Sequence, residues 1–503
     1  MALSPARRWT LLVTVAAGLL LIMLDNSILY TAVPTLTREL GAGGSESLWI
    51  INAYPLTMAG LLLGAGTLGD RVGHRRMFLI GLAVFGAASL MAAFSPNPEI
   101  LVAARILLAV GAASMMPATL ALIRIAFEDE RERNIAIAVW GSLSVVGGAL
   151  GPIVGGLLLE HFWWGSVFLI NIPVVVAAFV AGWILAPAGE SDPSKRWDLL
   201  SSLQVMAGLV GLVFAIKEFS KVAPSWTVVL GAALVSAAGF WTFGRRQRRL
   251  PYPLLDLAIF RNAPFLSGTV AAAVAMFAVG GIQLVTTQRF QLVAGFSPFQ
   301  AGLLVAALAL GSLPTGMLGG AILHRVGLLP LISGGLAVSA VGVLGTIVGL
   351  QFGLGWMIVG LVVTGAGLGL PMSVASSAII GNVPAHRAGM ASSVEEVSYE
   401  FGNLTAVALL GSLLTGIFAA TIRLPAGAPE AARDSVTSAM SAAGQGDGAN
   451  RALIDAASAA FDNAYTVVMV IAAGVLAVAA GVTWALLRRH GSRPAPEVAT
   501  VSH

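Results

Sequence analysis

The sequence predicts an all-α integral membrane protein. Hydrophobic residues make up 57% of the 503 positions and charged residues only 10%. Apolar runs of about 20 residues recur along almost the whole chain, and at about 1.5 Å per residue such a run crosses a hydrocarbon core of about 30 Å. We expect the spans to be helices, because lipid offers the backbone no hydrogen-bonding partner and the alternating pattern of a β-barrel is missing.

Fourteen spans are expected. Arg7 and Arg8 precede the first one, whose length argues for an uncleaved helix and against a signal peptide. The expected spans are residues 11–33, 48–68, 77–95, 101–125, 135–158, 166–185, 199–216, 226–244, 264–288, 299–322, 329–350, 354–381, 389–418 and 462–487.

The charges in the loops predict the orientation. With Arg7 and Arg8 placed in the cytoplasm, most of the 28 Lys and Arg residues fall in loops on that side. Because Lys and Arg are enriched in cytoplasmic loops, we expect an even number of spans with both termini in the cytoplasm. Residues 419–461 then form a partly disordered outer loop, and residues 488–503 a disordered cytoplasmic tail.

A faint internal repeat divides the chain. The segment Gly320-Ala-Ile-Leu-His-Arg-Val-Gly327 echoes Gly66-Thr-Leu-Gly-Asp-Arg-Val-Gly73. Parallel repeats with a binding site between them, at the midplane of the membrane, are a transporter architecture. We therefore expect a six-helix bundle at 11–185, two extra central helices at 199–244 and a second six-helix bundle at 264–487.

Several motifs together resemble a known family. The loop from Gly66 to Arg76 resembles the hallmark motif of the major facilitator superfamily, and Gly147-Gly-Ala-Leu-Gly-Pro-Ile-Val-Gly-Gly156 resembles the fifth-helix motif of its antiporters. Leu24-Asp-Asn-Ser-Ile-Leu-Tyr-Thr-Ala-Val-Pro34, Trp49 with Tyr54, and Phe168-Leu-Ile-Asn-Ile-Pro173 resemble the 14-span drug:proton antiporter branch. The resemblance implies the major facilitator fold and the export of quaternary ammonium compounds, dyes and other lipophilic cations.

Two motifs carry structural roles in this interpretation. In the first motif, Asp70 could cap the next helix or pair with Arg71, Arg75 or a charge in the loop at 128–133. Such a contact would hold an inner gate closed. In the second, glycines around a proline allow close helix packing and a kink. The gating motif is Gly66, Gly69, Asp70, Arg71, Gly73, Arg75 and Arg76, and the antiporter motif is Gly147, Gly151, Pro152, Gly155 and Gly156.

Ionisable residues inside spans are the candidates for the transport chemistry, because a charge at the bilayer centre costs at least about 2.5 to 3.5 kcal/mol. Asp25 lies near the middle of the first span, and Arg105 is the only basic residue well inside a span. A carboxyl group away from water can hold a proton and release it when water or a cation arrives. The alternatives are that Asp25 pairs permanently with Arg105 or caps a helix break, and that Arg105 pairs structurally with a carbonyl group or an acid.

Three acids form a second cluster in the thirteenth span. Glu396 and Glu400 are four residues apart and share a helix face, whereas Glu395 is turned about 100° away. Two acids on one face favour holding a shared proton or a cation. We therefore expect Glu396 and Glu400 to face the cavity, with Glu395 the weaker candidate; the alternative is a solvated helix end.

A site for varied cations also needs adaptable walls, which Met and aromatic side chains provide. Of the candidates, Tyr54 and Tyr399 are favoured over Trp49 and Met58, and each of these could instead be packing. No phosphate-binding loop, metal-ligand spacing or catalytic constellation is present, so the sequence predicts no cofactor beyond protons and no enzyme. The basic residues lie at helix ends, which is the membrane pattern and not a nucleic-acid surface.

The sequence therefore predicts a proton-coupled multidrug exporter in the inner (cytoplasmic) membrane, working by alternating access as a monomer. Its partners would be small lipophilic cationic drugs or dyes and membrane lipid. The alternatives are an exporter of a lipid or a self-made antibiotic on the same fold, and a membrane scaffold without transport activity.

Overall fold

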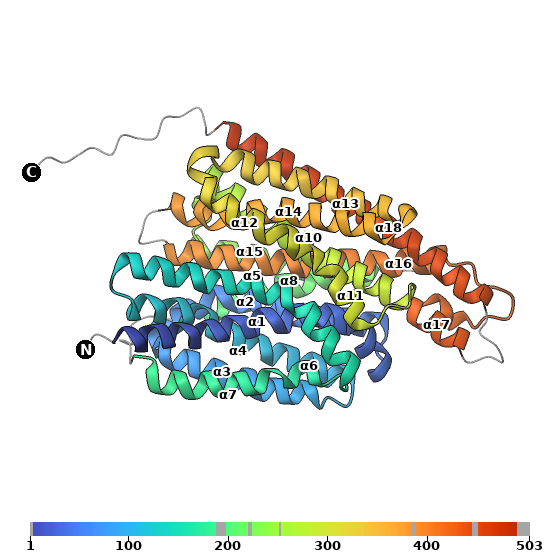
Figure 1. Ribbon diagram of the computed structural model, residues 1–503, viewed down its shortest axis with the longest axis horizontal. Coiled ribbons are helices and arrows are strands. Elements are labelled where there is room, and N and C mark those ends of the chain that lie inside the picture. Colours follow the sequence, from blue (N-terminus) through green and yellow to red (C-terminus); the bar gives the residue numbers. More distant parts are fainter. Residues whose placement is uncertain are drawn as a thin grey trace, which may run out of the picture.

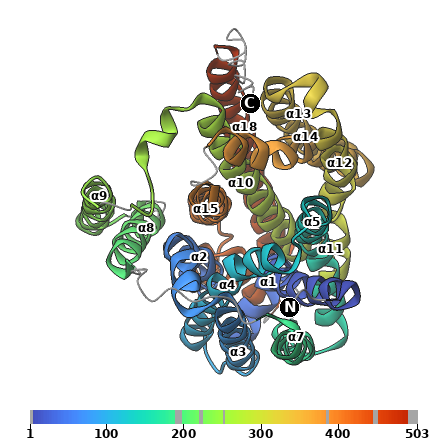
Figure 2. The same ribbon diagram turned by 90° about the vertical axis from the view of Figure 1, so that its left-hand side faces the viewer.

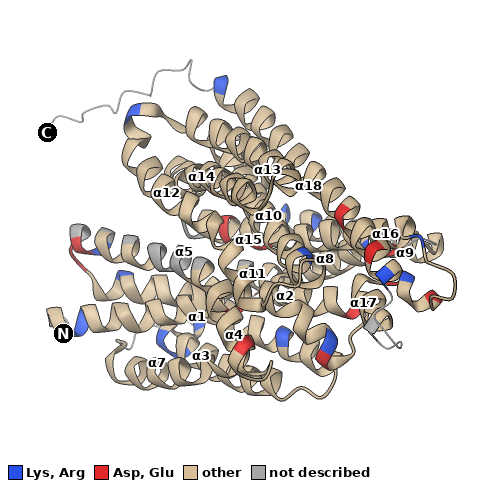
Figure 3. Cartoon of the chain, turned by 45° about the vertical axis from the view of Figure 1, so that its right-hand side comes forward, with Lys and Arg blue, Asp and Glu red and all other residues tan. Residues whose placement is uncertain are grey.

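Long apolar runs fold into long helices that lie roughly side by side (Figure 1). The computed structural model describes residues 4–187, 198–219, 224–250, 253–383, 388–444 and 451–489, and these ranges contain no strand. Helix α1 begins and helix α18 ends at the same end of the bundle (Figure 1), which we call the inner end; the opposite end is the outer end. Charged side chains are sparse along the middle of the helices (Figure 3).

The first half contains seven helical segments that share one hydrophobic core. Helices α6 and α7 together make one span, Ser166–Leu185. The segments are α1 (Pro5–Leu40), α2 (Gly44–Val72), α3 (His74–Ala93), α4 (Pro98–Ala126), α5 (Glu130–His161), α6 (Ser166–Leu169) and α7 (Asn171–Leu185).

The second half has its own hydrophobic core, and the two halves lie beside each other when the bundle is viewed from the inner end (Figure 2). Short 3-10 or π turns interrupt several of its helices. The segments are η1 (Leu257–Arg261), α10 (Ala263–Leu292), α11 (Pro298–Val305), α12 (Ala307–Val326), η2 (Pro330–Gly334), α13 (Gly335–Phe352), α14 (Leu354–Ile379), η3 (Ile380–Asn382), α15 (Ala388–Ala406), η5 (Val407–Gly411), α16 (Ser412–Thr421), η6 (Glu430–Arg433), α17 (Val436–Gly444) and α18 (Arg451–Arg488).

Two further helices, α8 (Leu199–Phe219) and α9 (Trp226–Gln247), form a hairpin at the side of the bundle, with α8 next to α2 (Figure 2). Glycine allows this contact: a Cβ atom added at Gly60 would lie 3.0 Å from the Met206 methyl group. At the inner end, Arg246 donates hydrogen bonds to Asp198 at 3.0 and 3.1 Å. The hairpin therefore packs against the first half, and a hydrogen-bonded pair joins the start of α8 to the end of α9.

Among the described residues, fewer helices pass the test for a membrane span, by length and apolar composition, than the fourteen expected. Within the described ranges, twelve helices are long and apolar enough to cross a membrane, and the bent helix α2 would be a thirteenth. Helix α5, with 32 residues, covers the fifth expected span but is not among them. The count of fourteen, the cytoplasmic termini and the division into domains therefore stay predictions.

Glycine at positive φ marks the internal repeat. Gly73 separates α2 from α3 with φ 99°, and Gly327 ends α12 with φ 81°. Because L side chains rarely adopt this conformation, both copies of the motif need glycine at the same point. The expected loop at 69–76 is wrong in extent: helix continues to Val72 and resumes at His74, so the connection is one residue long.

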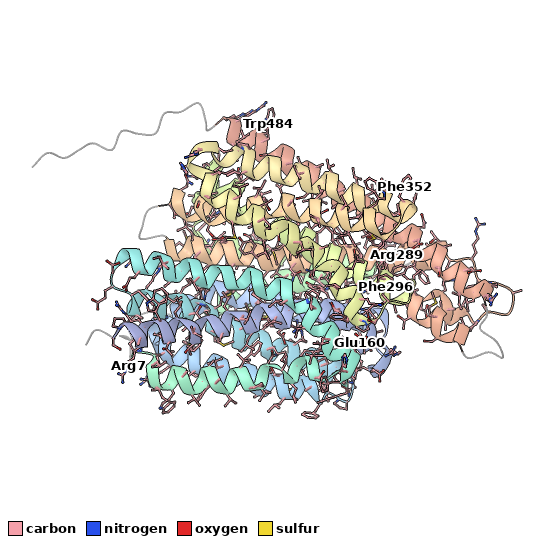
Figure 4. The ribbon with its side chains drawn as sticks, in the orientation of Figure 1. Arg7, Glu160, Arg289, Phe296, Phe352 and Trp484 are labelled. Carbon is pink, nitrogen blue, oxygen red and sulfur yellow. The ribbon has the colours of Figure 1, made fainter. Side chains whose placement is uncertain are left out.

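The outer segment 419–461, expected to be partly disordered, contains helix. Its described part holds η6 and α17, and α18 begins at Arg451, well before the expected start of the last span. Arg289 of α10 pairs with Asp462 of α18 at 2.9 Å, which fixes this extension to the outer end of the bundle. Figure 4 places Arg289 at that end and Arg7 at the inner end. Residues 445–450 and the tail 490–503 lie outside the described residues.

Candidate functional site: buried charges between the two halves

A buried ion pair lies in the centre of the first half. Asp25 of α1 and Arg105 of α4 form a salt bridge, and both side chains are fully buried. Asn171, at the start of α7, donates a second hydrogen bond to Asp25 at 3.1 Å and lies 3.2 Å from the Ser89 hydroxyl of α3. Side chains from α4 and α7 therefore bond to one carboxylate on α1, and Ser89 of α3 bonds to Asn171. The structure shows Asp25 and Arg105 as a pair, and the proton-coupling role of Asp25 stays a prediction.

Arg105 also connects this pair to α2. Its Nε donates to the Ile50 carbonyl oxygen at 3.3 Å, and its guanidinium carbon lies 4.5 Å from the centre of the Tyr54 ring. A cation over an aromatic face gains about 0.5 to 2 kcal/mol, more when the site is desolvated. The Arg105 Nη2 atom and the Tyr54 hydroxyl are buried without a hydrogen-bond partner among the described residues. Unpaired buried polar atoms are costly, so this is a place for water or a ligand.

The acids of α15 are not equivalent. Glu395 is buried and accepts hydrogen bonds from Ser376 of α14 and from Tyr399 at 3.1 Å. Glu400 is also buried, but its Oε2 atom has no hydrogen-bond partner within the described part of the chain. Glu396 is half-buried. Glu395 is therefore held by α14, whereas Glu400 is a buried acid with one oxygen atom unpaired among the described residues.

Glu400 and the ion pair of the first half lie on helices that pack together. Helix α15, which carries Glu400, packs against α2, which carries Tyr54 (Figure 2). The Tyr54 ring in turn faces Arg105. We call Asp25, Arg105, Tyr54 and Glu400 the charged cluster; it contains one buried carboxylate from each half.

The other expected lining residues lie in different surroundings. Tyr399 bonds to Glu395, and Met58 is fully buried in the core of the first half. The Trp49 ring packs 6.0 Å from Phe214 of α8 and lies 4.7 Å from the Lys217 ammonium group. Its described ring contacts are therefore with the hairpin, and only Tyr54 joins the charged cluster directly.

Asp70 of the gating motif has a partner that was not predicted from the sequence. Asp70 pairs with His74 at 3.2 Å, one helical turn further on, across the Gly73 connection. Arg75 donates to the Trp183 carbonyl oxygen at the end of α7. The expected partner loop at 128–133 instead supplies Glu132, which pairs with Arg8 of α1 at 3.0 Å.

The structure explains the glycines of the gating motif in different ways. A Cβ atom at Gly69 would lie 2.9 Å from the His74 ring, whereas one at Gly66 would meet open space. Gly73 is required by its backbone angle. Arg71 and Arg76 complete the motif as exposed basic residues at the inner end. Close approach therefore explains Gly69, backbone conformation explains Gly73, and nothing in the structure explains Gly66.

The antiporter motif on α5 packs against both halves. A Cβ atom at Gly147 would lie 2.8 Å from Met23, one at Gly151 1.8 Å from the Ser27 hydroxyl, and one at Gly155 2.9 Å from Ile28, so three glycines allow α1 to approach.

Two further positions of α5 meet α11 of the second half. A Cβ atom at Gly156 would lie 2.5 Å from the Phe299 Cα atom, and one at Gly302 would lie 2.0 Å from the Pro152 carbonyl oxygen. Pro152 lies within a continuous helix. Because these contacts lie toward the outer end of α5, they hold the two halves together on that side.

Further hydrogen bonds join the halves one to two turns outward of the acids. The Tyr30 hydroxyl of α1 donates to Asn403 of α15, and both side chains are buried. The Thr287 hydroxyl of α10 lies 3.1 Å from the Tyr30 carbonyl oxygen, and Gln291 donates to the Thr31 carbonyl oxygen at 2.9 Å. Sequence reasoning missed Asn403 and Asn171; the only signal for Asn171 was its place in the Phe168 to Pro173 motif.

Two helical halves around a buried cluster of opposite charges, with polar contacts between the halves, define a membrane transporter. Within the described ranges, no three metal-ligating side chains lie together.

The chain belongs to the Major Facilitator Superfamily, whose family model matches residues 15–403. It is 38% identical over 490 residues to the methyl viologen resistance protein SmvA of Salmonella typhimurium, covering 95% of this chain and 98% of the relative. It is 36% identical over 494 residues to the multidrug efflux pump LfrA of Mycolicibacterium smegmatis, covering 97% of each. The tetracenomycin C resistance and export protein of Streptomyces glaucescens is 32% identical over 415 residues, covering 81% of this chain and 76% of the relative.

Solved structures show the same fold. A bacterial homologue of the human lysosomal transporter Spinster, solved in an inward-facing and unoccupied conformation, matches with a TM-score of 0.68 at 17% identity, covering 98% of this chain and 100% of the other. An auto-inhibited peptide transporter of the POT family matches with a TM-score of 0.62, covering 98% and 99%. The protein is thus a multi-span membrane transporter of this superfamily, related to multidrug and resistance efflux pumps.

Proposed function

We propose that this protein exports lipophilic organic cations across the inner (cytoplasmic) membrane in exchange for protons, by alternating access. The observation that carries the proposal is the pair of buried carboxylates, one from each half: Asp25, which pairs with Arg105, and Glu400, whose Oε2 atom has no hydrogen-bond partner among the described residues. A cation attracted to the acids and protons that neutralise them would compete for the same place. The similarity to a methyl viologen resistance protein and to a multidrug efflux pump supports this class of cargo.

The outward movement of cargo would follow proton loading. Protons entering from outside would neutralise Glu400 and release Asp25 from its attraction to Arg105, so that the bound cation loses its counter-charge and leaves. Exchange of one proton for a monocation is electroneutral and uses only the pH gradient, about 1.4 kcal/mol per unit. Exchange of two protons would also use the membrane potential, about 2.3 kcal/mol per charge per 100 mV. Two acids in the cluster favour the second stoichiometry.

A second candidate is the export of a self-made antibiotic. It is favoured by the similarity to the tetracenomycin C resistance and export protein, whose name gives its own cargo. A cargo without positive charge would not need the carboxylates for binding. The two candidates therefore differ in how strongly transport depends on Glu396 and Glu400.

The deciding experiment is efflux of ethidium from proteoliposomes under imposed pH and voltage gradients. We expect wild-type efflux to accelerate when the outside is acidic, and to lose this acceleration in Glu400→Gln and, less completely, in Glu396→Gln. Glu99→Gln is the matched control, because Glu99 is an exposed acid in the first turn of α4, at the outer end. Wild-type efflux that ignores the pH gradient would refute proton coupling, and normal efflux in both variants would refute the role of the acids.

A further inference from the structure

A small cavity lies between the two halves at the outer end of the bundle. Its volume is about 60 Å³. Helices α1, α2, α10 and α16 wall it, and the segment that includes α17 covers one side. Its walls include Val33, Thr37, Leu48, Gln288, Thr415 and Phe418.

The chemistry of this cavity differs from that of the charged cluster. Its lining is aliphatic, aromatic, hydroxyl and amide, and no described residue that lines it is ionisable. Along α1, Val33 lies eight positions beyond Asp25, which is about 12 Å at 1.5 Å per residue. The cavity is therefore an uncharged space roughly two helical turns outward of Asp25, and it shares helices α1 and α2 with the charged cluster.

The contacts that separate the cavity from the acids are contacts between the halves. The Tyr30 hydroxyl bonds to Asn403 at a level between Asp25 and Val33, and the Thr287 hydroxyl reaches the Tyr30 carbonyl oxygen at 3.1 Å. These bonds must break when the halves part at the outer end. Parting of the halves would then join the cavity to the cluster and widen it at the same time.

We propose that this cavity is the closed form of an exit subsite, which holds the apolar aromatic body of the exported compound after it has left the acids. The inference rests on the proposed function. An exporter has to release its cargo, so the outward-facing site has to bind more weakly than the inner one. A wall without charge removes the Coulomb attraction and leaves only burial of apolar surface, about 25 cal/mol per Å².

The absence of charge on the described walls makes a specific prediction about selectivity. The inner cluster discriminates a cation from a neutral compound of the same shape, because its acids act on charge. The exit subsite binds both about equally, because their apolar areas are nearly the same. N-methylphenanthridinium and phenanthridine, which differ by one methyl group and one charge, form such a pair of probes at neutral pH.

Cysteine labelling can test this directly, because the chain contains no cysteine. A single cysteine at Thr415, in the cavity wall, is labelled with a small maleimide in purified protein, with and without each probe. Thr37→Cys, on the opposite wall, serves if Thr415→Cys does not fold. Thr421→Cys is the control, because Thr421 is exposed at the outer end of α16.

We expect both probes to slow labelling at Thr415→Cys about tenfold when their concentration is about ten times Kd. Labelling at Thr421→Cys stays unchanged. The protection persists after Glu400→Gln, because that substitution changes the inner cluster and not the cavity.

The inference is overturned if N-methylphenanthridinium protects and phenanthridine does not, if Glu400→Gln removes the protection, or if the control position is protected equally. It is also overturned if neither probe protects while proton-driven efflux is intact. Failure of the proposed function is a separate result: wild-type proteoliposomes then show no pH-driven efflux, whatever the labelling shows.

Discussion

Replacement of Asp25 by asparagine tests the centre of the cluster. The substitution keeps the shape of the side chain and removes its charge, which leaves the fully buried Arg105 guanidinium without a counter-ion in the first half. Breaking a buried pair by removing one partner costs about 3 to 5 kcal/mol. Because the amide oxygen still accepts one hydrogen bond, we expect a loss near the lower end, about 3 kcal/mol. Domain stabilities run from about 5 to 15 kcal/mol, so the variant should remain folded.

Transport and stability then respond differently to a second substitution. In Asp25→Asn, pH-driven ethidium efflux should be lost, since the first-half proton site is gone. In the double variant Asp25→Asn, Arg105→Gln, the uncompensated charge is removed, and most of the lost stability should return while efflux stays absent. Unfolding in detergent measures stability, and proteoliposomes measure efflux. Normal pH-driven efflux in Asp25→Asn would refute the reasoning, and so would a double variant that is less stable than Asp25→Asn.

Three further outcomes follow from packing, hydrogen bonding and charge. Gly151→Ala should destabilise the protein by about 1 to 3 kcal/mol, because the added methyl group would lie 1.8 Å from a hydroxyl oxygen of α1. Tyr30→Phe should raise labelling of a cysteine in the outer cavity about fivefold, because it removes a hydrogen bond to Asn403 worth about 1 kcal/mol that holds the halves together. At low pH, the α8–α9 hairpin should loosen: burial raises the pKa of Asp198, but its hydrogen bonds outweigh this and leave that pKa below its usual value.

Each of these outcomes has its own control. Gly148→Ala adds a methyl group to the same helix where nothing lies within 4 Å, so the variant should be as stable as the wild type or up to about 1 kcal/mol more stable in the same unfolding assay, because alanine has the higher helix propensity. Asn403→Ala should raise labelling as Tyr30→Phe does, and no change in either would contradict the role of the bond. Asp198 stabilises the folded state above its unfolded pKa of about 3.9, and this contribution, about 1 kcal/mol or less, is lost as the pH falls through the folded pKa. Asp198→Asn should therefore remove that part of the acid sensitivity measured by limited proteolysis.

Apolar runs and sparse charges were sufficient to predict most of the fold. Lipid leaves the backbone no alternative to helix, so length and composition placed most helices to within a few residues. The predicted loop around Gly73 was too long. Charged residues are typical of loops, but here the helix continues through Asp70 and Arg71. Once the helix is known to resume at once, His74 lies four positions from Asp70 and becomes its natural partner.

Contacts between distant parts of the chain could not be predicted. Asp25 and Arg105 stood out because a charge within a span is costly, and each was therefore a candidate partner of the other. Asn171 is neutral and does not stand out in the sequence, although it is the second hydrogen-bond donor to Asp25. The pairing of Tyr30 with Asn403 joins residues 373 positions apart, and no local pattern encodes it.

The outer helix α17 was missed for a different reason. Its segment is rich in alanine and serine, which resembles a disordered loop in composition. Alanine has the highest helix propensity, and this signal was available and was not used.

The separation of Asp25 and Arg105 along the chain has a consequence for biosynthesis. The two residues are 80 positions apart, and a ribosome adding about 5 to 20 residues per second needs about 4 to 16 s to cover that distance. Until Arg105 has been added, the Asp25 carboxyl group has no arginine partner. Apolar residues of α1, each worth about 0.3 to 0.6 kcal/mol, offset the cost of one acid, so α1 can insert without α4. A chain that ends before α4 would therefore carry an unmatched acid within its first span.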